Sequence, residues 1–267
     1  MRRWLVVLAL LALPARAEEI ALHGELRQGA LLYGSAAPGS LVTLDGAAVP
    51  VLPDGRYLIG LDRDAPAELR LVVTAPGGAA RSLALTVEPR TYDIQRIDGL
   101  PPEQVTPPPE LLERIARERA SLVAARATLR LADDWAQGFL WPAEGPVTGV
   151  YGSQRILNGE PRQPHYGIDL ALPVGTPVLA PATGVVVLAA EDYFYQGSLV
   201  IIDHGLGLSS TLMHLSALEV ATGEVVRQGQ VVARSGKSGR VTGAHLDWRV
   251  AWQGNWIDPA QLVPPLD

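Results

Sequence analysis

The chain has 267 residues, with 28 acidic and 22 basic side chains, a formal net charge of −6 and no cysteine. This length allows two domains of ordinary size, and the acidic balance argues against a nucleic-acid-binding surface. The absence of cysteine excludes disulfides and thiolate zinc fingers, so any zinc site must use imidazole and carboxylate ligands.

Residues 1–17 have the features of a secretory signal peptide. Arg2 and Arg3 give a positive start, an apolar run follows, and Ala15-Arg16-Ala17 fits a small-x-small cleavage site. The alternative is a membrane anchor, but about a dozen apolar residues are fewer than the roughly 20 that a spanning helix needs. We therefore expect an exported protein of the periplasm or cell envelope, without a stable membrane span after cleavage.

Residues 18–92 alternate apolar and polar positions between glycine and proline turns. Asp45-Gly46 and Asp54-Gly55 are typical turn dipeptides between such runs. Short strands at even spacing predict a small antiparallel β-sandwich. No cluster of reactive side chains appears here, and His23 is solitary, so we expect a spacer or docking domain.

Residues 93–138 are predicted to form a proline-rich linker and a helix. Pro101-Pro102 and Pro107-Pro108-Pro109 favour a stiff, extended chain. From Glu110 to about Asp134 there is no glycine or proline, and apolar residues recur at helical spacing. We expect the charged face of this helix to be solvated, with a partner-binding helix as the alternative.

Residues 139–267 return to short apolar runs separated by glycine turns, which predicts a third, all-β unit. The predicted fold class is therefore mainly β. Three histidines and two carboxylates of this segment stand between apolar or glycine neighbours: His165, Asp169, His214, His245 and Asp247.

Their spacing suggests a shared groove. His165 and Asp169 are four positions apart, and His245 and Asp247 are two apart, so in extended chain each pair shares a face. Catalytic zinc needs three protein ligands and one open position. The five side chains would supply three ligands and two spare imidazoles.

Residues 140–260 resemble the LytM/lysostaphin-type zinc endopeptidases, which cut peptide cross-links in bacterial peptidoglycan. The stretches that carry the resemblance are His165–Asp169, Pro173–Val178, Ile202–Leu208, His214–Ser216, Gly229-Gln230 and Ser238–Leu246. The resemblance implies an antiparallel β-sheet groove, Zn²⁺ as cofactor and peptidoglycan as partner. It implies that His165 and Asp169 are zinc ligands. It also implies that His245 and His214 are catalytic, acting on the attacking water and on the oxyanion.

The chain departs from the family at the last motif, where His-x-His is usual and Asp247 takes the place of the second histidine. A carboxylate oxygen lies as many bonds from Cα as the Nδ1 atom of histidine, so we predict Asp247 as the third zinc ligand. A second carboxylate lowers the charge of the metal, which predicts a weaker nucleophile near pH 7 or an alkaline optimum. The alternative is a catalytically weak or inactive protein that binds peptidoglycan or activates another hydrolase.

Arg155 precedes the first predicted ligand by ten positions. Its guanidinium is suited to bidentate binding of a substrate carboxylate, and we predict this role, with packing as the alternative.

Overall fold

The computed structural model describes residues 20–266 and places twenty strands, two α-helices and one 3-10 helix in them. The predicted signal peptide lies outside the described residues. Within 20–266, no helix combines the length and the apolar character that crossing a membrane requires. The dominance of strands confirms the predicted fold class.

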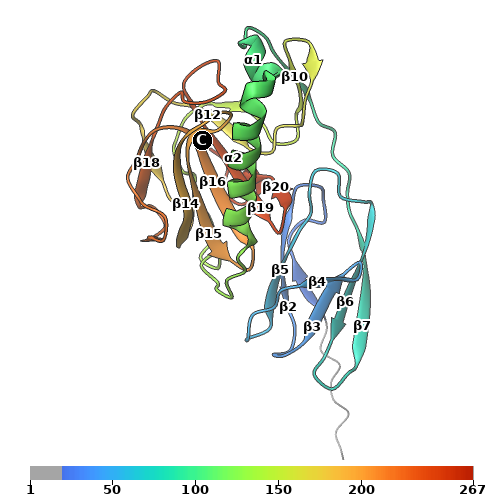
Figure 1. The fold of residues 1–267 in the computed structure, drawn as a ribbon. Coiled ribbons are helices and arrows are strands. Elements are labelled where there is room, and N and C mark those ends of the chain that lie inside the picture. Colours follow the sequence, from blue (N-terminus) through green and yellow to red (C-terminus); the bar gives the residue numbers. More distant parts are fainter. Residues whose placement is uncertain (1–19, 267) are drawn as a thin grey trace, which may run out of the picture.

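The N-terminal part is a sandwich of two antiparallel sheets (Figure 1). One sheet has the order β1 (Ala21–His23), β2 (Leu31–Ser35), β5 (Arg56–Gly60). The other has the order β4 (Ala47–Val49), β3 (Leu41–Leu44), β6 (Glu68–Thr74), β7 (Ala80–Thr86). Asp45 and Gly46 both have positive φ, 46° and 82°, as the two-residue hairpin between β3 and β4 requires. The predicted sandwich is confirmed.

The connecting segment differs from the extended linker that its prolines predicted. Residues 94–97 form strand β8 (Ile94–Ile97), which pairs in parallel with β10 (Gln154–Leu157) of the C-terminal part. A short helix α1 (Pro102–Val105) follows. The predicted long helix is α2 (Pro109–Ala127), which begins with proline at a first-turn position and ends earlier than the spacing suggested. The segment therefore packs against the C-terminal part as well as connecting it to the N-terminal sandwich.

The C-terminal part is built on a ten-stranded sheet whose main path has the order β17-β14-β15-β16-β19-β12-β9. All its strand pairs are antiparallel. Its elements are β9 (Val147–Gly149), β12 (Ile168–Ala171), β13 (Pro177–Leu179), β14 (Gly184–Tyr193), β15 (Gly197–Gly205), β16 (Leu208–Leu218), β17 (Val225–Val226), β18 (Val231–Ser235), β19 (His245–Trp252) and β20 (Asn255–Ile257). Strand β11 (Glu160–Pro161) pairs with β10, and a 3-10 helix (Pro259–Gln261) follows β20.

Strand β19 separates the core from the face that bears the site. Leu246, Trp248 and Val250 are fully buried in the core. His245 and Asp247 alternate with them and therefore point to the opposite face. Asp247 lies directly opposite Asp169 on β12 and Met213 on β16.

Helix α2 covers part of this same face (Figure 1). Its Leu122 packs against Leu199, Ile201 and Met213 of β15 and β16. The N-terminal sandwich contacts the sheet at β20, where the side chain of Asn255 donates to the carbonyl of Gly60 in β5 at 3.2 Å. The sheet face beside the site is thus lined by the connecting helix.

Candidate metal centre

His165, Asp169 and Asp247 each offer one ligand atom to a single point, and these atoms all lie within 4.8 Å of one another. Nε2 of His165 is 3.1 Å from Oδ1 of Asp169 and 3.4 Å from Oδ2 of Asp247. Tetrahedral zinc with bonds of about 2.0–2.1 Å separates its ligand atoms by about 3.3 Å. The spacing therefore fits a zinc-sized ion.

The backbone fixes this convergence. Asp169 and Asp247 are cross-strand neighbours on β12 and β19, so their carboxylates share one face of the sheet. His165 lies in the loop before β12, where its N–H donates to the Ser153 carbonyl at 2.8 Å and its carbonyl accepts from Gly152 at 2.7 Å. The loop is thereby held against the strand pair.

Several polar atoms of the cluster are buried without a hydrogen-bond partner among residues 20–266: Nδ1 and Nε2 of His165 and Oδ1 of Asp169. The side chains of His165 and Asp247 are 0% and 1% exposed. Buried polar atoms are normally paired. The close approach of Nε2 of His165 to Oδ1 of Asp169 without hydrogen-bond geometry indicates two atoms directed at a common ligand, so these residues fit a cation.

Each carboxylate of the cluster also has an arginine partner. Nη2 of Arg155 is 2.8 Å from Oδ2 of Asp169, and Nη2 of Arg249 is 2.7 Å from Oδ2 of Asp247. Burial raises the pKa of Asp247, but Arg249 and His165 outweigh it and hold that pKa well below its usual value. Asp247 is therefore a carboxylate at neutral pH, and the charges of the two acids and two arginines cancel.

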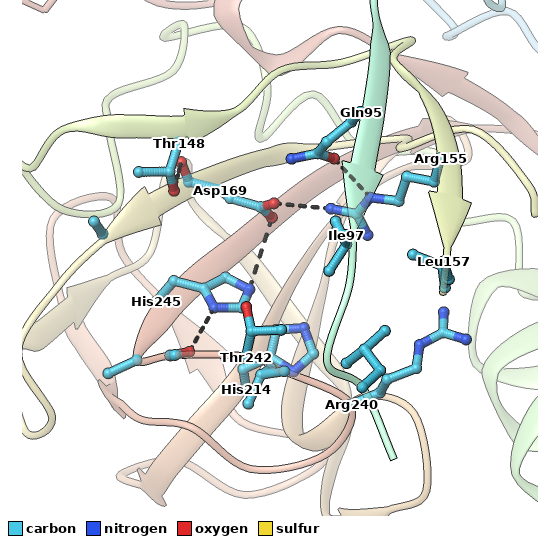
Figure 2. A pocket seen from close by; sticks show the side chains of 15 residues that line it. Gln95, Ile97, Thr148, Arg155, Leu157, Asp169, His214, Arg240, Thr242 and His245 are labelled. Carbon is cyan, nitrogen blue, oxygen red and sulfur yellow. Dashed lines mark hydrogen bonds and ion pairs between the residues drawn. The ribbon is translucent and has the colours of Figure 1, made fainter. Parts of the chain in front are cut away.

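Two imidazoles lie beside Asp169 of the cluster (Figure 2). The rings of His214 and His245 are 4.7 Å apart, and Nε2 of His245 is 3.9 Å from Oδ1 of Asp169. Nδ1 of His245 contacts the Gly243 carbonyl and Nδ1 of His214 the Ser238 carbonyl, each at 2.9 Å. Because a carbonyl only accepts, Nδ1 carries the proton of each neutral ring and Nε2 is left as an acceptor.

Burial fixes the charge state of one of these rings. It lowers the pKa of His214 from 6.5 to about 4, so this imidazole is neutral at pH 7. His214 also has a positive φ of 65°, a left-handed conformation that is costly for a residue with a Cβ and that concentrates at functional sites.

The five predicted site residues thus lie together, and their roles remain predictions. Arg155 lies beside Asp169, and its guanidinium already donates hydrogen bonds to two protein groups (Figure 2). Nη2 donates to Oδ2 of Asp169, and Nε donates to Oε1 of Gln95 at 3.0 Å. Substrate binding by Arg155 remains a prediction.

The sequence interpretation missed Arg249 and Gln95. Arg249 follows Asp247 by two positions on β19, and the period of a strand would have placed it on the same face. The contact of Gln95 depends on the pairing of β8 with β10, and no local pattern signals such a long-range pairing.

The groove beside the cluster is a cavity of about 280 Å³. The connecting segment supplies Gln95, Ile97 and Leu100, and the loop before β19 supplies Arg240 and Thr242 (Figure 2). The cavity opens directly onto Asp169 and both imidazoles, so a substrate in it would meet the candidate metal centre.

Comparison with known proteins shows what the part of the chain that bears the centre is similar to. The family model described as Peptidase family M23 matches residues 163–259. The peptidoglycan DD-endopeptidase ShyA of Vibrio cholerae is 38% identical over 103 residues, which are 39% of this chain and 24% of ShyA. The DD-carboxypeptidase/endopeptidase Mpg of Neisseria gonorrhoeae is 40% identical over 101 residues, 38% of this chain and 23% of Mpg. The chain thus spans about a quarter of these two relatives.

One solved structure matches over most of the chain. A Pseudomonas aeruginosa crystal structure assigned to peptidase M23 superimposes with a TM-score of 0.70 and 28% sequence identity. The match covers 89% of this chain and 95% of that chain. The similarity therefore extends beyond the peptidase region to the elements that precede it.

Proposed function

We propose that this chain, whose residues 163–259 match the model of Peptidase family M23, is an exported zinc-dependent endopeptidase that hydrolyses peptide bonds of bacterial peptidoglycan. The observation that carries the proposal is the convergence of His165, Asp169 and Asp247 on one point beside two imidazoles. The printed function of the relative ShyA, a peptidoglycan DD-endopeptidase, supports the substrate class. The signal-peptide pattern of residues 1–17 supports export to the periplasm or envelope.

The proposed ligand atoms are Nε2 of His165, Oδ1 of Asp169 and Oδ2 of Asp247. Zinc held there would polarise the scissile carbonyl and make a water molecule more acidic. Arg155 orients Asp169 through Oδ2, which is not the proposed ligand atom, whereas Arg249 contacts both oxygens of Asp247, including the proposed ligand Oδ2. Burial raises the pKa of both carboxylates, but His165 and the arginine partners outweigh it, so both acids are ionised, which is the state that binds a metal.

We assign proton transfer to His245 and His214. Nε2 of His245 faces the ligand cluster as an acceptor, so His245 takes the proton of the attacking water and returns it to the leaving amine. Nε2 of neutral His214 is also an acceptor. His214 therefore donates to an oxyanion only after it has gained a proton, and we assign it to proton transfer together with His245.

A second function is favoured by one observation. The charges of Asp169, Asp247, Arg155 and Arg249 cancel, which is an arrangement that a metal-free site also tolerates. On this alternative the groove binds peptidoglycan, or activates another hydrolase, with little or no turnover.

Zinc analysis combined with digestion of purified, cross-linked peptidoglycan separates the two functions. The endopeptidase is expected to contain zinc and to release muropeptides, and a chelator should abolish the release. An Asp169→Asn variant, which keeps the size of the side chain, should lack both properties. Absence of zinc together with absence of muropeptide release across a broad pH range would reject the endopeptidase and leave the binding protein.

A further inference from the structure

A second hollow of about 290 Å³ adjoins the candidate metal centre and is rich in arginine. It is lined by Arg155, Arg162, Arg240 and Arg249, and within residues 20–266 no acidic side chain lines it. It shares Arg155, Leu157, His214 and Arg240 with the groove described above. The two hollows therefore meet beside His214, one of the two imidazoles to which we assign proton transfer.

The four arginines differ in how their charge is balanced. Arg155 and Arg249 pair with Asp169 and Asp247. Arg240 has no carboxylate within 4.0 Å among residues 20–266. Its guanidinium lies 4.4 Å from the centre of the Tyr195 ring, and Nη1 donates to the Gln104 carbonyl at 3.3 Å. Neither contact neutralises its charge.

Arg162 adds a second cation to this hollow. Its Nη2 donates to the Val105 carbonyl and to Oγ1 of Thr106, both at 3.1 Å. Among residues 20–266, the only carboxylate within 4.0 Å of its guanidinium is that of Glu160, 3.9 Å away on a side chain that is 63% exposed. The hollow thus carries positive charge beyond what the protein compensates.

An uncompensated cation in a partly buried position is unfavourable. Burial and the neighbouring arginines lower the pKa of Arg240 to about 10, which still leaves it charged at pH 7. A planar guanidinium in a hollow beside a reaction centre is well suited to an anion that arrives with the substrate.

We propose that Arg240, supported by Arg162, binds a carboxylate group of the peptide substrate and so makes the enzyme selective for peptides that carry a free carboxylate near the scissile bond. This rests on the proposed endopeptidase function, because that function supplies a peptide in the adjoining groove. Carboxylate is the anion common to such peptides, whether at the chain terminus or on a side chain. Arg155, already engaged by Asp169, is a neighbour of this subsite rather than its centre.

The test uses three synthetic cross-linked stem peptides of one sequence: one with free carboxylates, one amidated at its C-terminus and one amidated on its side-chain carboxylate. Binding to the zinc-loaded full chain is measured by calorimetry, and cleavage is measured as kcat and KM. We expect the unmodified protein to bind the free acid at least tenfold more tightly than one of the two amidated forms. The amidated peptide that binds more weakly identifies the carboxylate that the protein binds.

Variants assign the selectivity to the residue. Arg240→Gln should reduce the preference to less than twofold by raising KM for the free acid, with kcat nearly unchanged. Arg240→Lys should retain a clear preference. Arg227→Gln is the matched control, because Arg227 is exposed and lines neither hollow, and it should behave as the unmodified protein does.

Equal binding of all three peptides by the unmodified protein would overturn the proposal. So would an equal loss for all three peptides in Arg240→Gln, which indicates a packing role, or a matching loss in Arg227→Gln, which indicates a general charge effect. Selective binding of the free acid without cleavage supports the subsite and rejects only the endopeptidase activity, so the two failures remain distinguishable.

Discussion

Arg249 binds both carboxylate oxygens of Asp247, with Nη2 2.7 Å from Oδ2 and Nε 3.1 Å from Oδ1. The two residues are two positions apart on β19 and share its site-bearing face. The contact explains how an acid is accommodated where the resemblance leads one to expect a histidine. It also places a cation in competition with any metal for the same oxygen.

Arg249→Gln is expected to raise the affinity for zinc by about tenfold or more. The substitution removes a positive charge that repels the metal, and unit charges about 4 Å apart interact by about 4 kcal/mol at an effective dielectric constant of 20. Zinc affinity is measured by competition with a chromogenic chelator, with Arg227→Gln as the charge-matched control. Weaker zinc binding by Arg249→Gln would show instead that Arg249 acts mainly by orienting Asp247.

Asp247→His is expected to lower the free energy of unfolding by about 2–3 kcal/mol, because Arg249, only 22% exposed, loses its carboxylate partner. The double substitution Asp247→His with Arg249→Gln should recover most of this loss and retain peptidase activity. Chemical denaturation of the four proteins forms a complete cycle. If the single variant is as stable as the parent, the ion pair contributes little to the fold.

The mainly β class was predictable because its signals are local. Asp45-Gly46 has the composition of a two-residue hairpin turn, and alternation on either side of it predicts strands. The clustering of His165, Asp169 and Asp247 was predicted from spacing together with a family resemblance, and the structure brings the three together. Strand β8 was missed because its partner β10 is about sixty residues away, and prolines nearby favoured an extended linker. Arg249 was missed, although the two-residue period that placed Asp247 on the same face as His245 also places Arg249 there.

His245→Ala and His214→Ala are each expected to lower kcat by about 100-fold or more, as loss of a general acid or base does. Zinc content should stay unchanged, because neither ring belongs to the three converging ligand atoms. His23→Ala, an exposed histidine of the N-terminal sheet, is the control. Loss of zinc from either groove variant would move that histidine into the ligand set.

Stability is expected to fall as the pH drops from 6.5 towards 4, and His214 contributes to this fall together with the buried ring of His204. This fully buried ring contacts the Thr183 carbonyl at 2.7 Å and Oγ of Ser210 at 2.9 Å, and burial lowers its pKa from 6.5 to about 4. In this interval the unfolded chain takes up a proton that the folded protein does not. The contribution of neutral His204 to the free energy of unfolding is therefore complete above pH 6.5 and is lost on acidification. The loss is about 2 kcal/mol near pH 4.5.

Denaturation curves at several pH values measure this effect, and His204→Gln should show a shallower slope over the same interval. An unchanged slope in His204→Gln would assign the pH dependence to other groups.

The most direct measurement of the central claim is the zinc content of the purified protein after equilibration with zinc and removal of the excess. We predict about one zinc per chain for the unmodified protein and none for Asp169→Asn or Asp247→Ala, with both variants folded by circular dichroism. No zinc in the unmodified protein, or equal zinc in Asp247→Ala, would contradict a centre built from His165, Asp169 and Asp247.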